Sequence, residues 1–325
     1  MRKIFVHSLI VVIGTIFIIN PFSTLYAAYQ GECWVISNGD TVYRLNQQGQ
    51  ASPNVIPNLT QAQAAEVNPK TGIVWISVSA ANSVYRYDPA EADPNAAFKA
   101  IPNIKRARAI SINPTDDTVW IAGVDVVKKV SGDGSQILAE IAGVYEPDVS
   151  VNVTDGSCWV TDSRGSIYRH DAAGTRVATA NLSAKMGEPK FVTVNPKTGN
   201  AWVADSQSSI IVKLDANGSE LLRITDIKAP SSPRVDVRDG GVWLVSSPST
   251  LIKLSAAGKK VKEFPGGMAI LAICPDPRDG GLWVADQLGS NYQGGVSKYS
   301  ANGTKKFENA IPLPSYVSVG LWPLP

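Results

Sequence analysis

The sequence predicts an all-β fold, a seven-bladed β-propeller with four-stranded blades, and three recurring features carry this prediction. The first is a tryptophan followed by a branched apolar residue, which recurs at intervals of 39 to 45 residues. These tryptophans are Trp34, Trp75, Trp120, Trp159, Trp202, Trp243 and Trp283. A repeat of this length is typical of one four-stranded blade.

The second feature is a short β segment and turn ahead of the tryptophan. In four repeats a Val or Ile lies eight residues before it and runs into an Asn-containing turn: Val67, Ile112, Val151 and Val194. Two repeats vary the turn, with Val237 six residues before its tryptophan and Ile273 ten residues before. This pattern predicts a β-hairpin that ends in the tryptophan strand.

The third feature is a basic residue flanked by apolar ones downstream of each tryptophan. These residues are Arg44, Arg86, Lys129, Arg169, Lys213, Lys253 and Lys298. We expect their stems to pack against apolar neighbours while the charge reaches water. A tight turn then follows in six repeats, with Asn, Asp or Ser three residues before a Gly, as in Asp215 and Gly218. A fourth β segment comes next, for example 221–224.

The two ends of the chain complete the ring. The strand of Trp34 has no room before it for an inner strand, whereas residues 314–319 form a β segment without a blade of its own. We expect this C-terminal strand to join the first blade, because closure removes exposed sheet edges. Only three residues follow Trp322, so it cannot begin an eighth blade. Each repeat tryptophan should pack between blades, with its indole N–H bonded to a backbone carbonyl.

The N-terminus has the pattern of a secretory signal. Arg2 and Lys3 precede a long apolar run, and small residues follow around Ala27 and Ala28. We expect residues 1–27 to be a signal peptide and residues 28–325 a single propeller domain. This places the protein outside the cytoplasm, secreted or periplasmic, without membrane insertion after cleavage. The alternative is an uncleaved membrane anchor.

The charge balance bears on the partner. Residues 1–27 contain two of the 30 basic residues and none of the 28 acidic ones, so the remaining chain is neutral. A neutral chain argues against nucleic acid, which needs a basic excess. The candidate partners are a protein, a peptide or a glycan, and we expect a monomer.

Three cysteines remain in the predicted domain: Cys33, Cys158 and Cys274. We expect buried free thiols. A Cys33–Cys274 bridge between the first and last blades is the alternative, although the spacing gives no local signal for it.

The segment from Pro189 to Gly218 resembles an NHL-type or YVTN-type propeller repeat and is similar to repeats of the streptogramin-lyase (virginiamycin B lyase) group. The resemblance extends over essentially the whole predicted domain and implies a scaffold, since such scaffolds host enzymes, sensors and binding proteins. Members of the lyase group rely on histidines near the propeller axis, with a metal ion. This chain has only His7 and His170, so it lacks those histidines. His170 is expected to be a solvated residue at an outer turn.

Other chemical candidates have structural interpretations. Asp162, Asp205 and Asp286 each lie three residues after their tryptophan, where they should cap backbone N–H groups of the following loop. The segment 276–280 fits either a calcium site or a turn. No Walker loop, dinucleotide fingerprint or haem motif is present, and we expect no cofactor and no bound metal.

Binding is expected where the inner strands begin, around the central channel. Residues there do not repeat from blade to blade, as a site grafted onto a repeating scaffold would require. The candidate binding residues are Gln63, Arg108, Asp148, Lys190, Arg234 and Tyr316. The sequence favours a non-catalytic scaffold or sensor with no catalytic residues. The alternative is a lyase or hydrolase with a carboxylate and divalent-metal site at the channel mouth.

Overall fold

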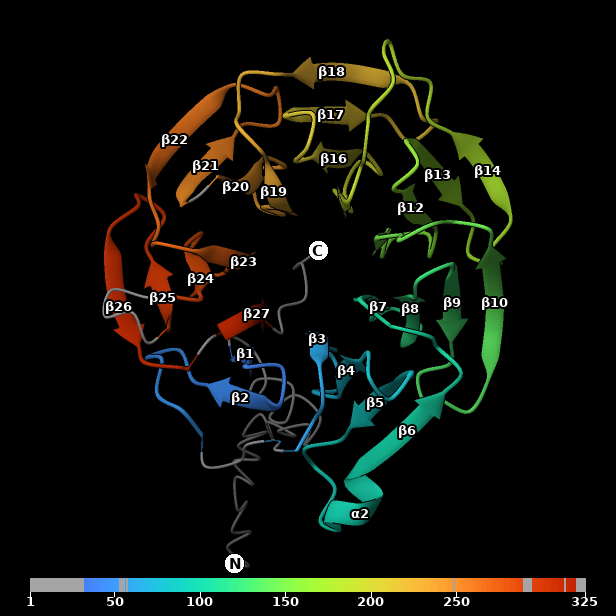
Figure 1. Ribbon diagram of the computed structural model, residues 1–325, viewed down its shortest axis with the longest axis vertical. Helices are drawn as coiled ribbons and strands as arrows, with labels where there is room; N and C mark the ends of the chain where they lie inside the picture. The colour runs from blue at the N-terminus through green and yellow to red at the C-terminus, as the bar shows by residue number, and fades with distance from the viewer. Residues whose placement is uncertain are drawn as a thin grey trace, which may run out of the picture.

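The computed structural model describes residues 32–52, 56, 58–247, 249–288, 294–312 and 314–319. They form a ring of seven antiparallel blades around a central channel, a β-propeller (Figure 1). The predicted signal peptide, its cleavage site and Trp322 lie outside the described residues. Among those residues, no helix has the length and apolar character needed to cross a bilayer.

Six blades each contain four strands that run in chain order from the channel outward. Blade 2 comprises β3 (Ala62–Val67), β4 (Val74–Val78), β5 (Ser83–Tyr87) and β6 (Phe98–Pro102). Blade 3 comprises β7 (Ala109–Asn113), β8 (Thr118–Ala122), β9 (Val126–Val130) and β10 (Ile137–Ala142). Blade 4 comprises β11 (Val149–Val151), β12 (Cys158–Asp162), β13 (Ser166–His170) and β14 (Arg176–Thr179).

The other three complete blades follow the same plan. Blade 5 comprises β15 (Phe191–Val194), β16 (Ala201–Asp205), β17 (Ile210–Leu214) and β18 (Glu220–Ile224). Blade 6 comprises β19 (Ser231–Val235), β20 (Val242–Ser246), β21 (Thr250–Leu254) and β22 (Lys260–Pro265). Blade 7 comprises β23 (Ile270–Pro275), β24 (Leu282–Asp286), β25 (Gly295–Tyr299) and β26 (Lys305–Asn309). A four-residue helix, α2 (Pro94–Ala97), precedes β6.

Blade 1 joins the two ends of the chain, as the sequence predicts. Its inner strand is β27 (Pro314–Val319), which pairs antiparallel with β1 (Cys33–Ser37). β1 in turn pairs with β2 (Thr41–Leu45). The outer position holds isolated bridges, Val42 with Ile56 and Leu45 with Ala51. The seventh blade therefore contacts the first through β27, and the sheet of blade 1 closes the ring.

The seven repeat tryptophans form the packing layer between blades, and each is at most 1% exposed. The predicted indole hydrogen bond is found for Trp159, which donates to the carbonyl of Gly199 at 3.3 Å. For five others the prediction is wrong, since their buried Nε1 atoms have no hydrogen-bond partner among the described residues: Trp34, Trp120, Trp202, Trp243 and Trp283. In place of these hydrogen bonds, the indoles contact other aromatic rings and basic side chains.

The basic residue of each repeat pairs directly across the sheet with the tryptophan, as Lys253 does with Trp243. In five blades the cation lies over the indole, 5.2 to 5.8 Å from the ring centroid. The expectation that these charges reach water is wrong for Lys129, Lys253 and Lys298, which are at most 6% exposed. They are held by cation–π attraction and by oxygen atoms, such as the carbonyl of Ala172 for Lys129 at 2.9 Å.

His170 is buried, so the prediction that it is solvated is wrong. It is the last residue of β13, and the equivalent strand ends in blades 1, 5 and 6 are Leu45, Leu214 and Leu254. It is 3% exposed. Burial lowers the pKa of His170 to about 4, and the nearby Arg176 adds to the shift. The repeat thus uses a neutral imidazole as a core side chain.

The tight turns and the free thiols agree with the sequence prediction, except that Cys274 is only partly buried. Asp215 accepts hydrogen bonds from the N–H groups of Asn217 and Ser219, and Gly218 has φ +90°. All three cysteines are free, so the alternative Cys33–Cys274 bridge is not formed. Burial is the main cause that raises the pKa of each thiol, which makes the thiols unreactive.

Candidate functional site

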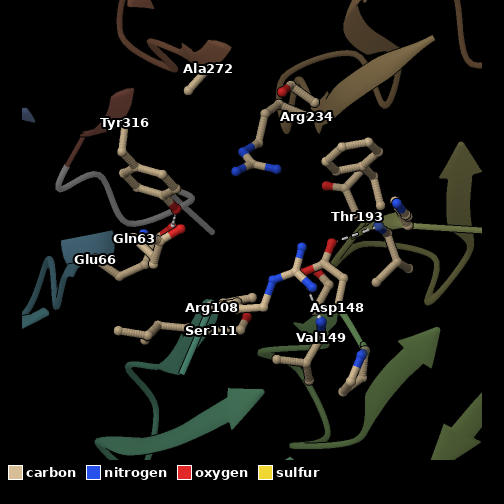
Figure 2. Close-up of a pocket in the computed structure, with 18 of the residues that line it drawn as sticks. Gln63, Glu66, Arg108, Ser111, Asp148, Val149, Thr193, Arg234, Ala272 and Tyr316 are labelled. Carbon is tan, nitrogen blue, oxygen red and sulfur yellow. Dashed lines mark hydrogen bonds between the residues drawn. The ribbon is translucent and has the colours of Figure 1, made fainter. Parts of the chain in front are cut away.

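A cavity of about 360 Å³ opens where the inner strands begin, around the channel. Its volume lies near the lower end of the range of roughly 300–1,000 Å³ seen for small-ligand sites. Figure 2 shows side chains from several blades converging on it. All six residues singled out from the sequence line this cavity: Gln63, Arg108, Asp148, Lys190, Arg234 and Tyr316. We call this cavity and its lining the central pocket.

The inner strands bring these residues together because each strand begins at the same face. Arg108, Asp148 and Lys190 each lie one residue before an inner strand, β7, β11 and β15. Gln63 and Arg234 lie within β3 and β19, and Tyr316 lies within β27. Because the inner strand begins at an equivalent place in every blade, each blade can contribute one side chain to the pocket.

A ring of seven residues forms the deeper wall of the channel, at the inner-strand position directly opposite each tryptophan. Its members, in blade order from 1 to 7, are Ser318, Glu66, Ser111, Ser150, Thr193, Arg234 and Cys274. We call this set the channel ring. Five of its members line the central pocket: Glu66, Ser111, Ser150, Thr193 and Arg234.

Hydroxyl groups of the channel ring connect neighbouring inner strands. The N–H of Val151 donates to Ser111 Oγ at 3.0 Å, and the N–H of Val194 donates to Ser150 Oγ at 3.1 Å. The N–H of Val235 donates to Thr193 Oγ1 at 3.3 Å. Each hydroxyl thus satisfies an inner-edge N–H of the next blade and keeps its own proton for another acceptor.

Glu66 and Tyr316 form a hydrogen-bonded pair on one side of the pocket. Tyr316 Oη donates to Glu66 Oε1 at 2.6 Å, and Ser318 Oγ donates to Glu66 Oε2 at 2.8 Å. Burial raises the pKa of Glu66, against the effect of these bonds. Burial also raises the pKa of Tyr316 well above its usual value, and the Glu66 carboxylate adds to this. Tyr316 therefore stays protonated at neutral pH.

Asp148 lies on the wall formed by blades 4 and 5. Its carboxylate accepts the N–H of Val192 and the N–H of Val149, both at 2.9 Å. Burial nevertheless raises the pKa of Asp148 to about 6. This carboxyl group can therefore gain or lose a proton near neutral pH, which is the property of an acid–base residue or of a pH-sensitive contact.

Two of the pocket cations already have carboxylate partners. Arg108 Nη1 lies 3.2 Å from Glu146 Oε2, and Lys190 Nζ lies 2.9 Å from Glu188 Oε1. Both pairs are partly exposed at the rim, so each contributes little to stability.

Arg234 differs from both. It is partly buried, and Figure 2 shows its guanidinium extending into the pocket. Its one described hydrogen bond runs from Nη1 to the carbonyl of the preceding residue, Pro233, at 3.1 Å. Within the described chain it forms no ion pair. Burial alone would lower the pKa of Arg234, but nearby acidic groups, among them Glu66 and Asp148, raise it overall, so the guanidinium remains charged.

The remaining sequence candidates belong to the scaffold. Asp205 accepts N–H groups from Gly187, Glu188 and Ser208, which confirms its capping role. Asp162 and Asp286 cap backbone N–H groups in the same way. The segment 276–280 is a turn whose Asp276 is paired with Lys298 at 2.5 Å and Arg278 at 2.7 Å. No cluster of three or more metal-binding side chains occurs among the described residues.

Sequence reasoning did not single out Glu66 or the hydroxyls of the channel ring. A signal was available, because Glu66, Ser111 and Arg234 each lie nine residues before their repeat tryptophan, as do the equivalent residues of blades 4, 5 and 7. This position is polar in most blades, which is unusual for a strand in the middle of a fold.

Comparisons with known proteins establish the fold. No protein-family model matches the chain, and no curated protein matches it. A functionally unknown protein from Desulfotomaculum acetoxidans DSM 771 is similar in structure, with a TM-score of 0.72 and 12% identity over 89% of this chain and 98% of that one. The structure of streptogramin B lyase has a TM-score of 0.65 and 16% identity, over 89% and 92% of the two chains.

A chain in the structure of the mitotic checkpoint complex is similar to a comparable degree. Its TM-score is 0.65 and its identity 14%, over 80% of this chain and 81% of that one. Identities this low define the class alone: the protein is a seven-bladed β-propeller with structural similarity to streptogramin B lyase.

Proposed function

We propose that this chain is a secreted or periplasmic, non-catalytic β-propeller that binds a glycan, peptide or protein end in its central pocket. The observation that carries the proposal is the convergence of six non-repeating residues on one cavity, within a scaffold whose tryptophan and paired basic residue recur in every blade. The signal-like N-terminus supports a location outside the cytoplasm. We propose further that the blades are NHL- or YVTN-type repeats, on the strength of the segment from Pro189 to Gly218.

A screen of glycan and peptide arrays with two matched triple variants tests this function. The pocket variant carries Arg108→Gln, Lys190→Gln and Arg234→Gln. The control carries the same charge change at three exposed residues outside the pocket, Lys197→Gln, Lys259→Gln and Lys306→Gln. We expect the wild type and the control to bind the same ligands and the pocket variant to lose them. Ligands retained by the pocket variant would place the binding surface elsewhere.

A lyase or hydrolase is the second candidate, and the pKa of Asp148, about 6, is the observation that favours it. A carboxyl group that titrates near neutral pH can serve as a general acid or base. Mass spectrometry of each bound ligand after prolonged incubation distinguishes the two functions. A product that forms with the wild type and not with Asp148→Asn would establish the enzyme, whereas an unchanged ligand supports the binding protein.

A further inference from the structure

We infer that Arg234 is the anchor for a carboxylate on the ligand, and that the ligand is an acidic sugar, such as the terminal residue of a uronate-containing glycan. This inference rests on the proposed binding function and assigns the chemistry of its ligand. It is carried by the position of Arg234 in the channel ring and by the donors around it.

The first step is the unused capacity of Arg234. A guanidinium carries five N–H donors in a planar fork that fits a carboxylate with two parallel hydrogen bonds. Only one described bond uses these donors, and it goes to the backbone of Pro233. The two other cations of the pocket are paired with Glu146 and Glu188. Arg234 is therefore the pocket cation that is left available for an anion within the described residues.

The second step is the surrounding hydroxyls. Ser150 and Thr193 precede Arg234 in the channel ring, in blades 4 and 5, and each accepts a backbone N–H from the next blade. An oxygen that already accepts directs its own O–H to another acceptor. No described hydrogen bond uses these protons. Arg234 and its neighbouring hydroxyls thus present several donors to one space, as the binding of an oxygen-rich anion requires.

The third step selects a carboxylate over a phosphate. Glu66 and Asp148 lie on the walls beside Arg234 and contribute to its electrostatic environment. A dianionic phosphate would meet stronger repulsion from them than a singly charged carboxylate. Both carboxylates can also accept hydrogen bonds from ligand hydroxyls, and Gln63 lies on the wall opposite Asp148 (Figure 2). The lining also includes apolar side chains such as Ile110, Phe191 and Leu271, so the pocket offers polar groups to the hydroxyls of a sugar and apolar surface to its C–H faces.

The test compares three sugars that differ only at carbon 6: galacturonate, galactose and galactose 6-phosphate. Binding to the full propeller is measured by calorimetry. We expect galacturonate to bind at least about 10-fold more tightly than galactose, as charge-assisted bonds would give. Arg234→Gln should abolish this preference, and Arg234→Lys should keep part of it, because a lysine retains the charge without the fork. Lys197→Gln, at an exposed lysine outside the pocket, is the control and should retain it.

Three results would overturn the inference. The first is no preference for galacturonate over galactose, including no binding of either sugar. The second is tighter binding of galactose 6-phosphate or of N-acetylalanine, a probe for a peptide carboxyl end. The third is a preference that survives Arg234→Gln. If neutral ligands bind and are lost in the pocket triple variant, the proposed function stands while this inference fails. If no ligand depends on the pocket, both fail.

Discussion

Two of the cations in blade 6, Lys253 and Arg234, have opposite surroundings. Lys253 lies 5.5 Å from the centroid of Trp243, and its Nζ contacts Asp236 and Asp239, each at 2.6 Å. Arg234 faces the central pocket with a single described hydrogen bond to a backbone carbonyl. A basic residue stands at the Lys253 position in all seven blades, whereas arginine occurs in the channel ring only in blade 6.

This difference separates scaffold from site. In the repeated layer, the cation, the indole face and the acceptor oxygens all come from the chain itself, so a buried cation such as Lys253 already has its partners in the folded protein. In the pocket, Arg234 has N–H donors, and Ser150 and Thr193 have hydroxyl protons, that no described hydrogen bond uses, and such incomplete local arrangements occur where a protein binds something. The predictions below either break the scaffold or change the pocket.

The largest effect is expected from a truncation after Pro312, because it damages both regions. It removes β27, which pairs with β1 and supplies Tyr316 and Ser318 to Glu66. The open ring would expose two sheet edges and lose a large part of the roughly 5–15 kcal/mol typical of domain stability. We expect aggregation in size-exclusion chromatography and loss of a cooperative melt. A chain ending at Val319 is the control. A truncated monomer with the wild-type melting temperature would contradict ring closure by β27.

Lys253→Met tests the repeated cation layer. It leaves the Asp236 carboxylate, 1% exposed, without its cation, and we expect a loss of about 3–5 kcal/mol in the free energy of unfolding. Lys213→Met is the matched comparison, because the one hydrogen bond of Lys213 Nζ within the described part of the chain goes to the carbonyl of Ala256. There we expect a loss of about 1 kcal/mol. Denaturant titration measures both. Equal losses would mean that the buried Asp236 carboxylate does not determine the loss in the free energy of unfolding.

The pH dependence of stability compares His170 in the scaffold with Asp148 in the pocket. The pKa of His170 is about 4 in the folded chain and about 6.5 when unfolded, so unfolding takes up a proton between these values. Its contribution therefore destabilises the fold as pH falls from 6.5 to 4, by about 3 kcal/mol. Asp148, with a folded pKa of about 6, has the opposite sign, because the folded state holds its proton more tightly and gains stability as pH falls.

Single variants separate these two contributions. We expect His170→Phe to gain stability relative to the wild type between pH 6.5 and 4, since the acid-sensitive group is gone. Asp148→Asn should lose stability relative to the wild type over pH 6 to 4, since the offsetting group is gone. Urea midpoints measured at several pH values show the slopes. Parallel curves for all three proteins would refute both assignments.

The sequence predicted more of the scaffold than of the site, for a physical reason. Positions such as Trp202 and Gly218 recur because the same hairpin and the same blade contact recur, so one sequence contains several copies of the signal. The pocket depends on contacts between different blades, such as Tyr316 with Glu66, and these are 250 residues apart in the chain. The prediction for His170 was wrong because it followed the polarity of the histidine side chain. It did not follow the repeat position, which is apolar in the neighbouring blades.

The smallest effect on stability is expected for Arg234→Gln. The substitution removes an unpaired cation from a partly buried position, so the desolvation that is relieved offsets the attraction that is lost to Glu66 and Asp148. We expect the free energy of unfolding to change by less than about 1 kcal/mol, against the larger loss for Lys253→Met in the same blade. The pKa of Asp148 should rise above about 6, because Arg234 lowers it in the wild type. Carboxyl NMR titration checks this shift. A destabilisation as large as that of Lys253→Met would mean that Arg234 is part of the scaffold, and the distinction between the two cations would fail.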